Sequence, residues 1–67
     1  MYIVQATILN VKYYLHVFAN GEFRLEGLKD NATCYPTFAN ANLARIAMQK
    51  EFDTELKINT ELEIITR

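Results

Sequence analysis

The dipeptide Asn20-Gly21 constrains the fold of this chain more than any other feature. It separates two stretches, residues 13–18 and 22–27, in which apolar and polar side chains alternate. Asn-Gly between two such stretches is the strongest short-range signal of a β-hairpin. The sequence therefore predicts two neighbouring antiparallel strands that are joined at this dipeptide.

The same alternation selects the length of the hairpin loop. A two-residue loop would pair Phe18 with Phe23 and would mix apolar and charged side chains on both faces. A three-residue loop, with Gly21 in the left-handed conformation, pairs Phe18 with Glu22 and separates the two faces. We therefore predict the three-residue loop. One face then carries Tyr13, Leu15, Val17, Phe23 and Leu25, and the other carries Tyr14, His16, Phe18, Glu22, Arg24 and Glu26.

The rest of the chain completes a single α+β domain over residues 1–67. Alternation predicts a first strand at residues 2–9, a turn at Asn10-Val11 and a last strand at 60–66. The hairpin strands are expected at 12–18 and 22–28, followed by a loop at 29–33. The predicted architecture is a small antiparallel sheet in the order βββαβ, with one helix packed on one face.

The helix is expected to begin after Thr37, because this residue is a good N-cap and the preceding Tyr35-Pro36 favours an extended chain. It should run from residue 38 to about residue 52, where Phe52 would close the core. Its apolar arc is expected to comprise Ala41, Leu43, Ala44, Ile46, Ala47 and Met48, opposite a polar arc of Asn42, Arg45, Gln49 and Asp53. Leu43 and Phe23 are thus predicted to be core residues.

Composition excludes several classes of protein. The 67 residues include one cysteine and one histidine, so neither a disulfide framework nor a zinc site of several Cys and His ligands is expected. A single thiol fits a reducing cytoplasm, and the N-terminal residues do not form a signal peptide. The apolar runs are too short to span a membrane. We expect a cytoplasmic protein without membrane contact.

Individual residues give little support to catalysis. His16 is the only side chain expected to titrate near neutrality, but a general base needs a reacting partner, and a strand position opposite Arg24 explains it better. Cys34 precedes the helix and could be a reactive thiol, although a small core residue is the favoured interpretation. The acidic residues match no calcium loop, and there is no glycine-rich phosphate loop. The prediction is no enzyme, no metal and no cofactor.

The candidate site is the face of the hairpin that carries Tyr14, His16, Phe18 and Arg24. These side chains could bind a partner, or another part of the chain could cover them, such as the termini or the last strand. A protein partner is favoured over nucleic acid, because carboxylates on the same face would repel a phosphate backbone. The alternative is a small nucleic-acid-binding domain that uses the sheet. Self-association or a tight complex is expected, because one helix leaves one sheet face uncovered.

The chain resembles small phage and mobile-element accessory proteins. The residues that carry this resemblance are Tyr13-Tyr14, Asn20-Gly21, Tyr35-Pro36-Thr37 and Ala41. The layout is also similar to the arm-type DNA-binding domains of tyrosine recombinases, but Glu22 and Glu26 stand where a basic set would be needed. What the resemblance implies is a phage-encoded inhibitor or regulator that binds a bacterial host protein.

Overall fold

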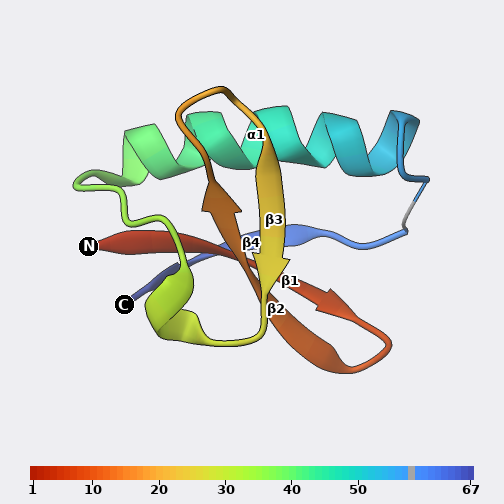
Figure 1. Ribbon diagram of the computed structural model, residues 1–67, viewed down its shortest axis with the longest axis horizontal. Coiled ribbons are helices and arrows are strands. Elements are labelled where there is room, and N and C mark those ends of the chain that lie inside the picture. Colours follow the sequence, from red (N-terminus) through yellow and green to blue (C-terminus); the bar gives the residue numbers. More distant parts are fainter. Residues whose placement is uncertain (58) are drawn as a thin grey trace.

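The chain folds into an antiparallel sheet with one long helix across it, in a computed structural model that describes residues 1–57 and 59–67. The elements are β1 (Tyr2–Ile8), β2 (Val11–Val17), β3 (Phe23–Glu26), a 3-10 helix η1 (Lys29–Asn31), α1 (Phe38–Thr54) and β4 (Leu62–Thr66). The strands lie in the order β3-β2-β1-β4, and α1 crosses one face (Figure 1). The predicted α+β class and βββαβ order are confirmed.

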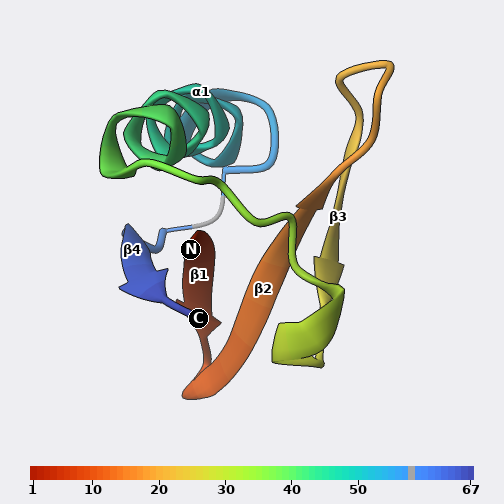
Figure 2. The ribbon, with the colours of Figure 1, turned by 90° about the vertical axis from the view of Figure 1, so that its left-hand side faces the viewer.

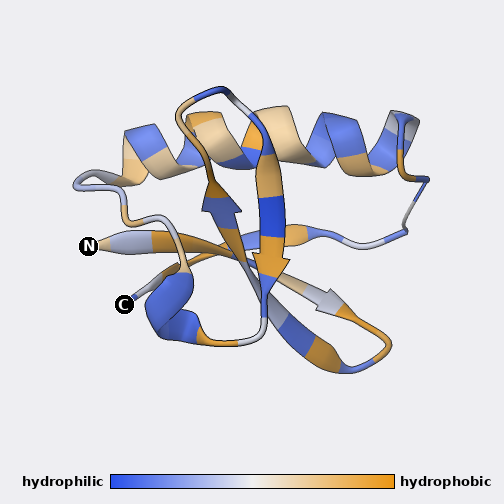
Figure 3. Ribbon diagram, in the orientation of Figure 1, coloured by the Kyte–Doolittle hydropathy of each residue, from blue (hydrophilic) through white to orange (hydrophobic). Residues whose placement is uncertain are grey.

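The hairpin between β2 and β3 has the predicted three-residue loop. Val17 pairs with Phe23, and the peptide N–H of Phe18 donates to the carbonyl of Glu22 over 2.8 Å. Gly21 has a φ of +88°, which side chains with a Cβ rarely adopt. Hydrophobic and hydrophilic residues alternate along β3 (Figure 3), as a strand with two different faces requires.

The turn between β1 and β2 lies one residue earlier than predicted. Ile8 pairs with Val11, so the two turn residues are Leu9 and Asn10, with φ values of 51° and 65°. Positive φ at both positions is typical of the type I′ turn, whose twist matches that of the flanking strands. Leu9 is therefore exposed in the turn instead of ending the strand. The structure also ends β3 at Glu26 and forms η1 within the predicted loop.

The two central strands diverge at one end, and the segment between η1 and α1 fills the gap (Figure 2). On one side of this segment, Thr33 N–H donates to Leu15 O over 3.0 Å, and its hydroxyl accepts from Val17 N–H over 2.7 Å. On the other side, Tyr35 and Tyr2 exchange two peptide hydrogen bonds of 2.8 Å. This short connection thus acts as a partial strand, because it gives hydrogen-bond partners to the peptide groups of both central strands where they separate.

The core lies between α1 and the inner face of the sheet, where α1 packs mainly on β1 and β4. Its buried members are Val4, Ala6, Leu15, Phe52 and Leu62, with Phe23, Leu25, Tyr35, Ala44 and Met48 among the partly buried residues around them. Phe52 closes the core as predicted. The predicted placement of Leu43 is wrong, since 67% of this residue is exposed, and Ile46 is 50% exposed.

The helix is rotated relative to the prediction because apolar residues occur on all of its sides. Ala41, fully buried, brings the backbone close to the sheet, and Gln49 turns toward β4 instead of solvent. The Gln49 side chain accepts from Leu62 N–H over 2.9 Å and donates to Thr60 O over 2.8 Å. Its amide therefore imitates a neighbouring strand and closes the beginning of the β4 edge.

Candidate functional site

The candidate side chains lie together on the sheet face opposite α1. His16 pairs with Arg24 across the hairpin, Tyr14 pairs with Glu26, and Phe18 follows β2 on the same face. We call this set of five residues the outer hairpin face. The structure brings together all four residues that the sequence singled out, together with Glu26, which the sequence also placed on this face.

Phe18 is the exposed apolar residue at the turn end of the outer hairpin face. It is 39% exposed, and the ring of His16 meets it edge-on, with 4.6 Å between the ring centroids. The guanidinium carbon of Arg24 lies 5.4 Å from the centroid of the Phe18 ring. A cation–π contact of this kind stabilises an exposed pair by about 0.5–1 kcal/mol. The two neighbours thus hold the ring in place while leaving part of it open to solvent.

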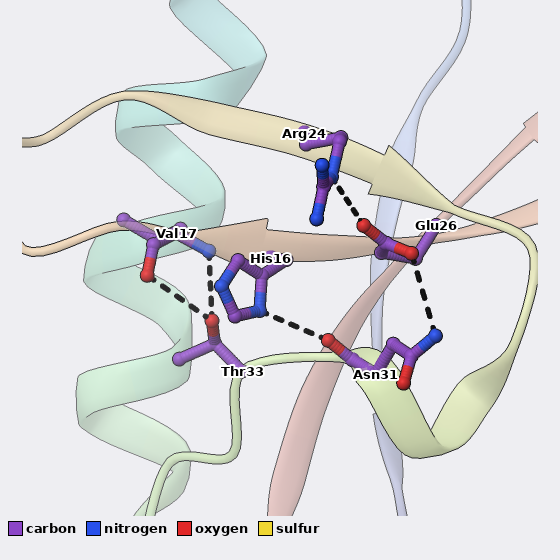
Figure 4. A network of polar contacts seen from close by, with 6 residues as sticks. All are labelled: His16, Val17, Arg24, Glu26, Asn31 and Thr33. Carbon is purple, nitrogen blue, oxygen red and sulfur yellow. Dashed lines mark hydrogen bonds and ion pairs between the residues drawn. The ribbon is translucent and has the colours of Figure 1, made fainter.

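A series of hydrogen bonds through Glu26 and Asn31 also fixes the guanidinium of Arg24 (Figure 4). Its Nε donates to the Glu26 carboxylate over 2.5 Å, and the Asn31 side-chain amide donates to the same carboxylate over 3.4 Å. The side chain of Glu26 is 16% exposed, whereas that of Arg24 is 64% exposed. Glu26 is therefore the fixed member of the pair. The terminal guanidinium nitrogens of Arg24 have no hydrogen bond within residues 1–57 and 59–67 and remain available to a ligand.

His16 is tied to the 3-10 helix. Its Nδ1 lies 3.0 Å from the carbonyl oxygen of Asn31, which can only accept a hydrogen bond (Figure 4). Nδ1 therefore carries the proton in the neutral ring, and Nε2 is the free acceptor. The ring lies beside a hollow lined by Arg24, Glu26, Asp30, Asn31 and Ala32. This arrangement fixes the orientation of the imidazole beside the carboxylates of Glu26 and Asp30.

The outer hairpin face is partly covered, and the cover comes from an element that the sequence did not indicate. Both η1 and Thr33 lie against β2, and they provide the cover on this face. His16, which contacts Asn31, and Tyr14 are half-buried, and Phe18 and Arg24 are exposed. The polar Asn31 belonged to a predicted loop, and no sequence pattern linked it to His16, fifteen residues earlier.

Cys34 lies apart from this face and is half-buried, so it is less enclosed than a core position would be. Arg67 Nη1 lies 3.2 Å from its sulfur, and Nη2 forms a 3.2 Å ion pair with Asp30. The hydrogen bond to Cys34, followed by that to Asp30, raises the pKa of Arg67, so its guanidinium stays charged. These contacts join the end of β4 to η1.

Two further observations concern the part of the chain that the structure describes. It contains no group of three or more His, Cys, Asp or Glu side chains that could hold a metal ion. It also contains no helix that is both long and apolar enough to span a membrane.

The comparisons with known proteins do not assign this fold or this face to a family. No family model matches the chain, and neither the curated proteins nor the solved structures include a match.

Proposed function

We propose that this chain is a protein-binding module that holds one partner through the outer hairpin face and carries out no catalysis. The observation that carries the proposal is the exposed ring of Phe18, which is held between His16 and Arg24. Aromatic and arginine side chains dominate the binding energy of many protein interfaces. A ring that is already fixed by its neighbours also loses little conformational entropy when a partner covers it.

The side chains of this face indicate which chemical groups a partner should carry. An apolar pocket would receive Phe18, and a carboxylate or a carbonyl oxygen beside that pocket would accept from the free guanidinium nitrogens of Arg24. A phosphate backbone fits less well, because Glu22 is exposed on the same side of the hairpin and the chain has a net charge of −1. A folded or extended protein surface is therefore the proposed ligand.

The test is capture of a partner from a bacterial lysate by the immobilised chain, followed by mass spectrometry and by affinity measurement with the purified partner. Phe18→Ala should weaken binding about 30-fold or more, which corresponds to the loss of one interface anchor. Arg24→Glu should weaken it too, mainly through slower association. Both variants should keep the thermal stability of the parent chain to within a few degrees.

The matched control is Leu43→Ala, which removes an exposed apolar side chain on the opposite side of the molecule. It should leave binding unchanged. Equal affinity of the Phe18→Ala variant and the parent chain would contradict the proposal. Binding to DNA or RNA at low salt that fades as salt is added would instead support the nucleic-acid alternative.

A further inference from the structure

The two edges of the sheet differ in how well they are closed. At the β4 edge, the Gln49 side-chain amide accepts a hydrogen bond from Leu62 N–H and donates one to Thr60 O. At the β3 edge, no side chain or strand does the same within the described residues. Phe18 and Glu22 are hydrogen-bonded partners, so alternate residues of β3 direct their peptide groups toward β2. The N–H and C=O groups of Phe23 and Leu25 therefore point outward.

Figure 2 shows β3 at the free side of the molecule, with α1 on the far side above β1 and β4. An open edge strand is a template for pairing with another strand. Its four residues include two apolar and two oppositely charged side chains, Phe-Arg-Leu-Glu. The arrangement of these charges identifies the strand that fits.

We propose that β3 pairs antiparallel with β3 of a second copy of this chain, around a two-fold axis at Leu25. Leu25 would then exchange two peptide hydrogen bonds with Leu25 of the second copy. Phe23 would stand opposite Gly27 of the second copy. An axis at Phe23 is less favourable, because Leu25 would meet Gly21, whose N–H already donates to Phe18 O over 3.0 Å.

Charge complementarity supports this register. With the axis at Leu25, Arg24 stands opposite Glu26 of the second copy, and the symmetry repeats this pair. Opposite charges directly across two strands stabilise the pairing, and like charges destabilise it. A shift that placed the axis at Arg24 would set Arg24 against itself and Glu22 against Glu26. The charges therefore favour the proposed register over its nearest alternative.

The other face of the new strand pair is apolar. Leu25 would contact Leu25 of the second copy beside the core, and the ring of Phe23 would lie over Gly27 of the second copy. A Cβ at Gly27 would have no atom within 4 Å, so there is open space above this glycine. An aromatic side chain across from a glycine is a favourable combination in paired strands.

The helices do not obstruct this dimer. α1 lies on the inner face of the sheet, mainly on β1 and β4, and its Phe52 ring reaches Phe23 of β3 with 6.0 Å between the ring centroids. With strands about 4.8 Å apart, the midpoint between β1 and β4 would lie roughly 14 Å from the axis, so most of each helix stays away from the second copy. The product is an eight-stranded sheet that presents two outer hairpin faces side by side. This inference is independent of the proposed function, because its measurement needs no other protein.

The test uses two charge-reversed variants, Arg24→Glu and Glu26→Lys. The parent chain should form a dimer in a concentration series followed by analytical ultracentrifugation. Each variant alone places two like-charged pairs across the interface and should dimerise about tenfold more weakly or worse. An equimolar mixture restores both opposite-charge pairs, so native mass spectrometry should detect mainly the mixed dimer. Recovery of dimerisation in the mixture would show that each single variant loses the contact between copies, and that the loss of the Arg24–Glu26 ion pair within one chain is not the cause.

Glu61→Lys is the matched control, because it makes the same charge change beside β4 and should leave dimerisation unchanged. Circular dichroism verifies that every variant is folded. A parent chain that stays monomeric throughout the series would overturn the proposal. A mixture that dimerises no better than its components would do so as well. Loss of the dimer in the Glu61→Lys variant would place the interface at β4 instead.

Discussion

Replacement of Gln49 by alanine should destabilise the protein, although this helix residue was predicted to face solvent. The substitution removes the acceptor at 2.9 Å from Leu62 N–H and the donor at 2.8 Å from Thr60 O. Leu62 is only 5% exposed, so its N–H would lose its acceptor in a largely buried position. An unsatisfied buried N–H costs about 1–3 kcal/mol, and the second bond adds about 1 kcal/mol. The sum is about 2–4 kcal/mol.

That loss is large for a chain of this size, whose free energy of unfolding is expected to be about 3–10 kcal/mol. The melting temperature should fall by at least about 8 °C. Hydrogen exchange should also become faster at the Leu62 amide than in the parent chain. The control is Lys50→Ala, which alters an exposed residue of the same helix and should change stability by less than about 0.5 kcal/mol. Equal melting temperatures for the two variants would refute the assigned role of Gln49.

Five further substitutions test the packing, the helix cap, a turn and the pH dependence of stability, each by thermal or denaturant unfolding. Phe52→Ala should lower the free energy of unfolding by about 3–5 kcal/mol because the ring is fully buried, whereas Leu43→Ala should lower it by less than about 0.5 kcal/mol. A larger loss for Leu43→Ala than for Phe52→Ala would contradict the observed buried face of the helix. Thr37→Ala removes the N-cap acceptor of α1 and should cost about 1 kcal/mol. Leu9→Asn should stabilise the protein by about 1 kcal/mol, because Leu9 is 92% exposed and has a φ of 51°. Burial raises the pKa of Tyr35, so the contribution of its neutral phenol to stability is present at neutral pH and lost as the pH rises above about 10. A Tyr35→Phe variant should lose less stability over that pH range. Parallel pH profiles of stability for the variant and the parent chain would contradict this.

The hairpin loop and the start of the helix could be predicted from the sequence because each depends on local chemistry. A one-residue slip at Asn20-Gly21 would invert both faces, so the alternation alone selects the register. Thr37 offers a side-chain acceptor where a helix must begin, and its hydroxyl does accept the Asn40 N–H over 3.1 Å. Local signals of this kind do not depend on how the rest of the chain packs.

The rotation of the helix could not be predicted in the same way. Apolar residues surround α1, so periodicity alone could not identify the buried side. The actual side is set by long-range contacts, namely the close approach at Ala41 and the hydrogen bonds between Gln49 and the start of β4. The insertion of Thr33 and Tyr35 between β1 and β2 is also a long-range effect, since its bonds reach back to Leu15 and Tyr2.

For the candidate site, the sequence predicted the face but not the contacts that support it. Alternation placed Tyr14, His16, Phe18 and Arg24 together, and the structure agrees. The contacts of Asn31 with His16 and Glu26 depend on where η1 folds back, which no local pattern encodes. A candidate face could thus be recognised from strand periodicity, while its polar support required the three-dimensional structure.

The position of this support explains how a small sheet can present an aromatic ring on the face opposite its helix. α1 packs mainly on β1 and β4 and contacts the hairpin on the inner face, where Phe52 meets Phe23, so the outer face of the hairpin has no cover from the helix. A two-stranded hairpin alone is marginally stable in water. Here the segment from η1 to Thr33 bonds to β2 from the outer face and from the gap beside β1, and it also contacts Glu26 on β3. The positions of Phe18 and Arg24 therefore depend on this connection through His16 and Glu26, and loosening it should weaken the proposed binding at the outer hairpin face before it unfolds the core.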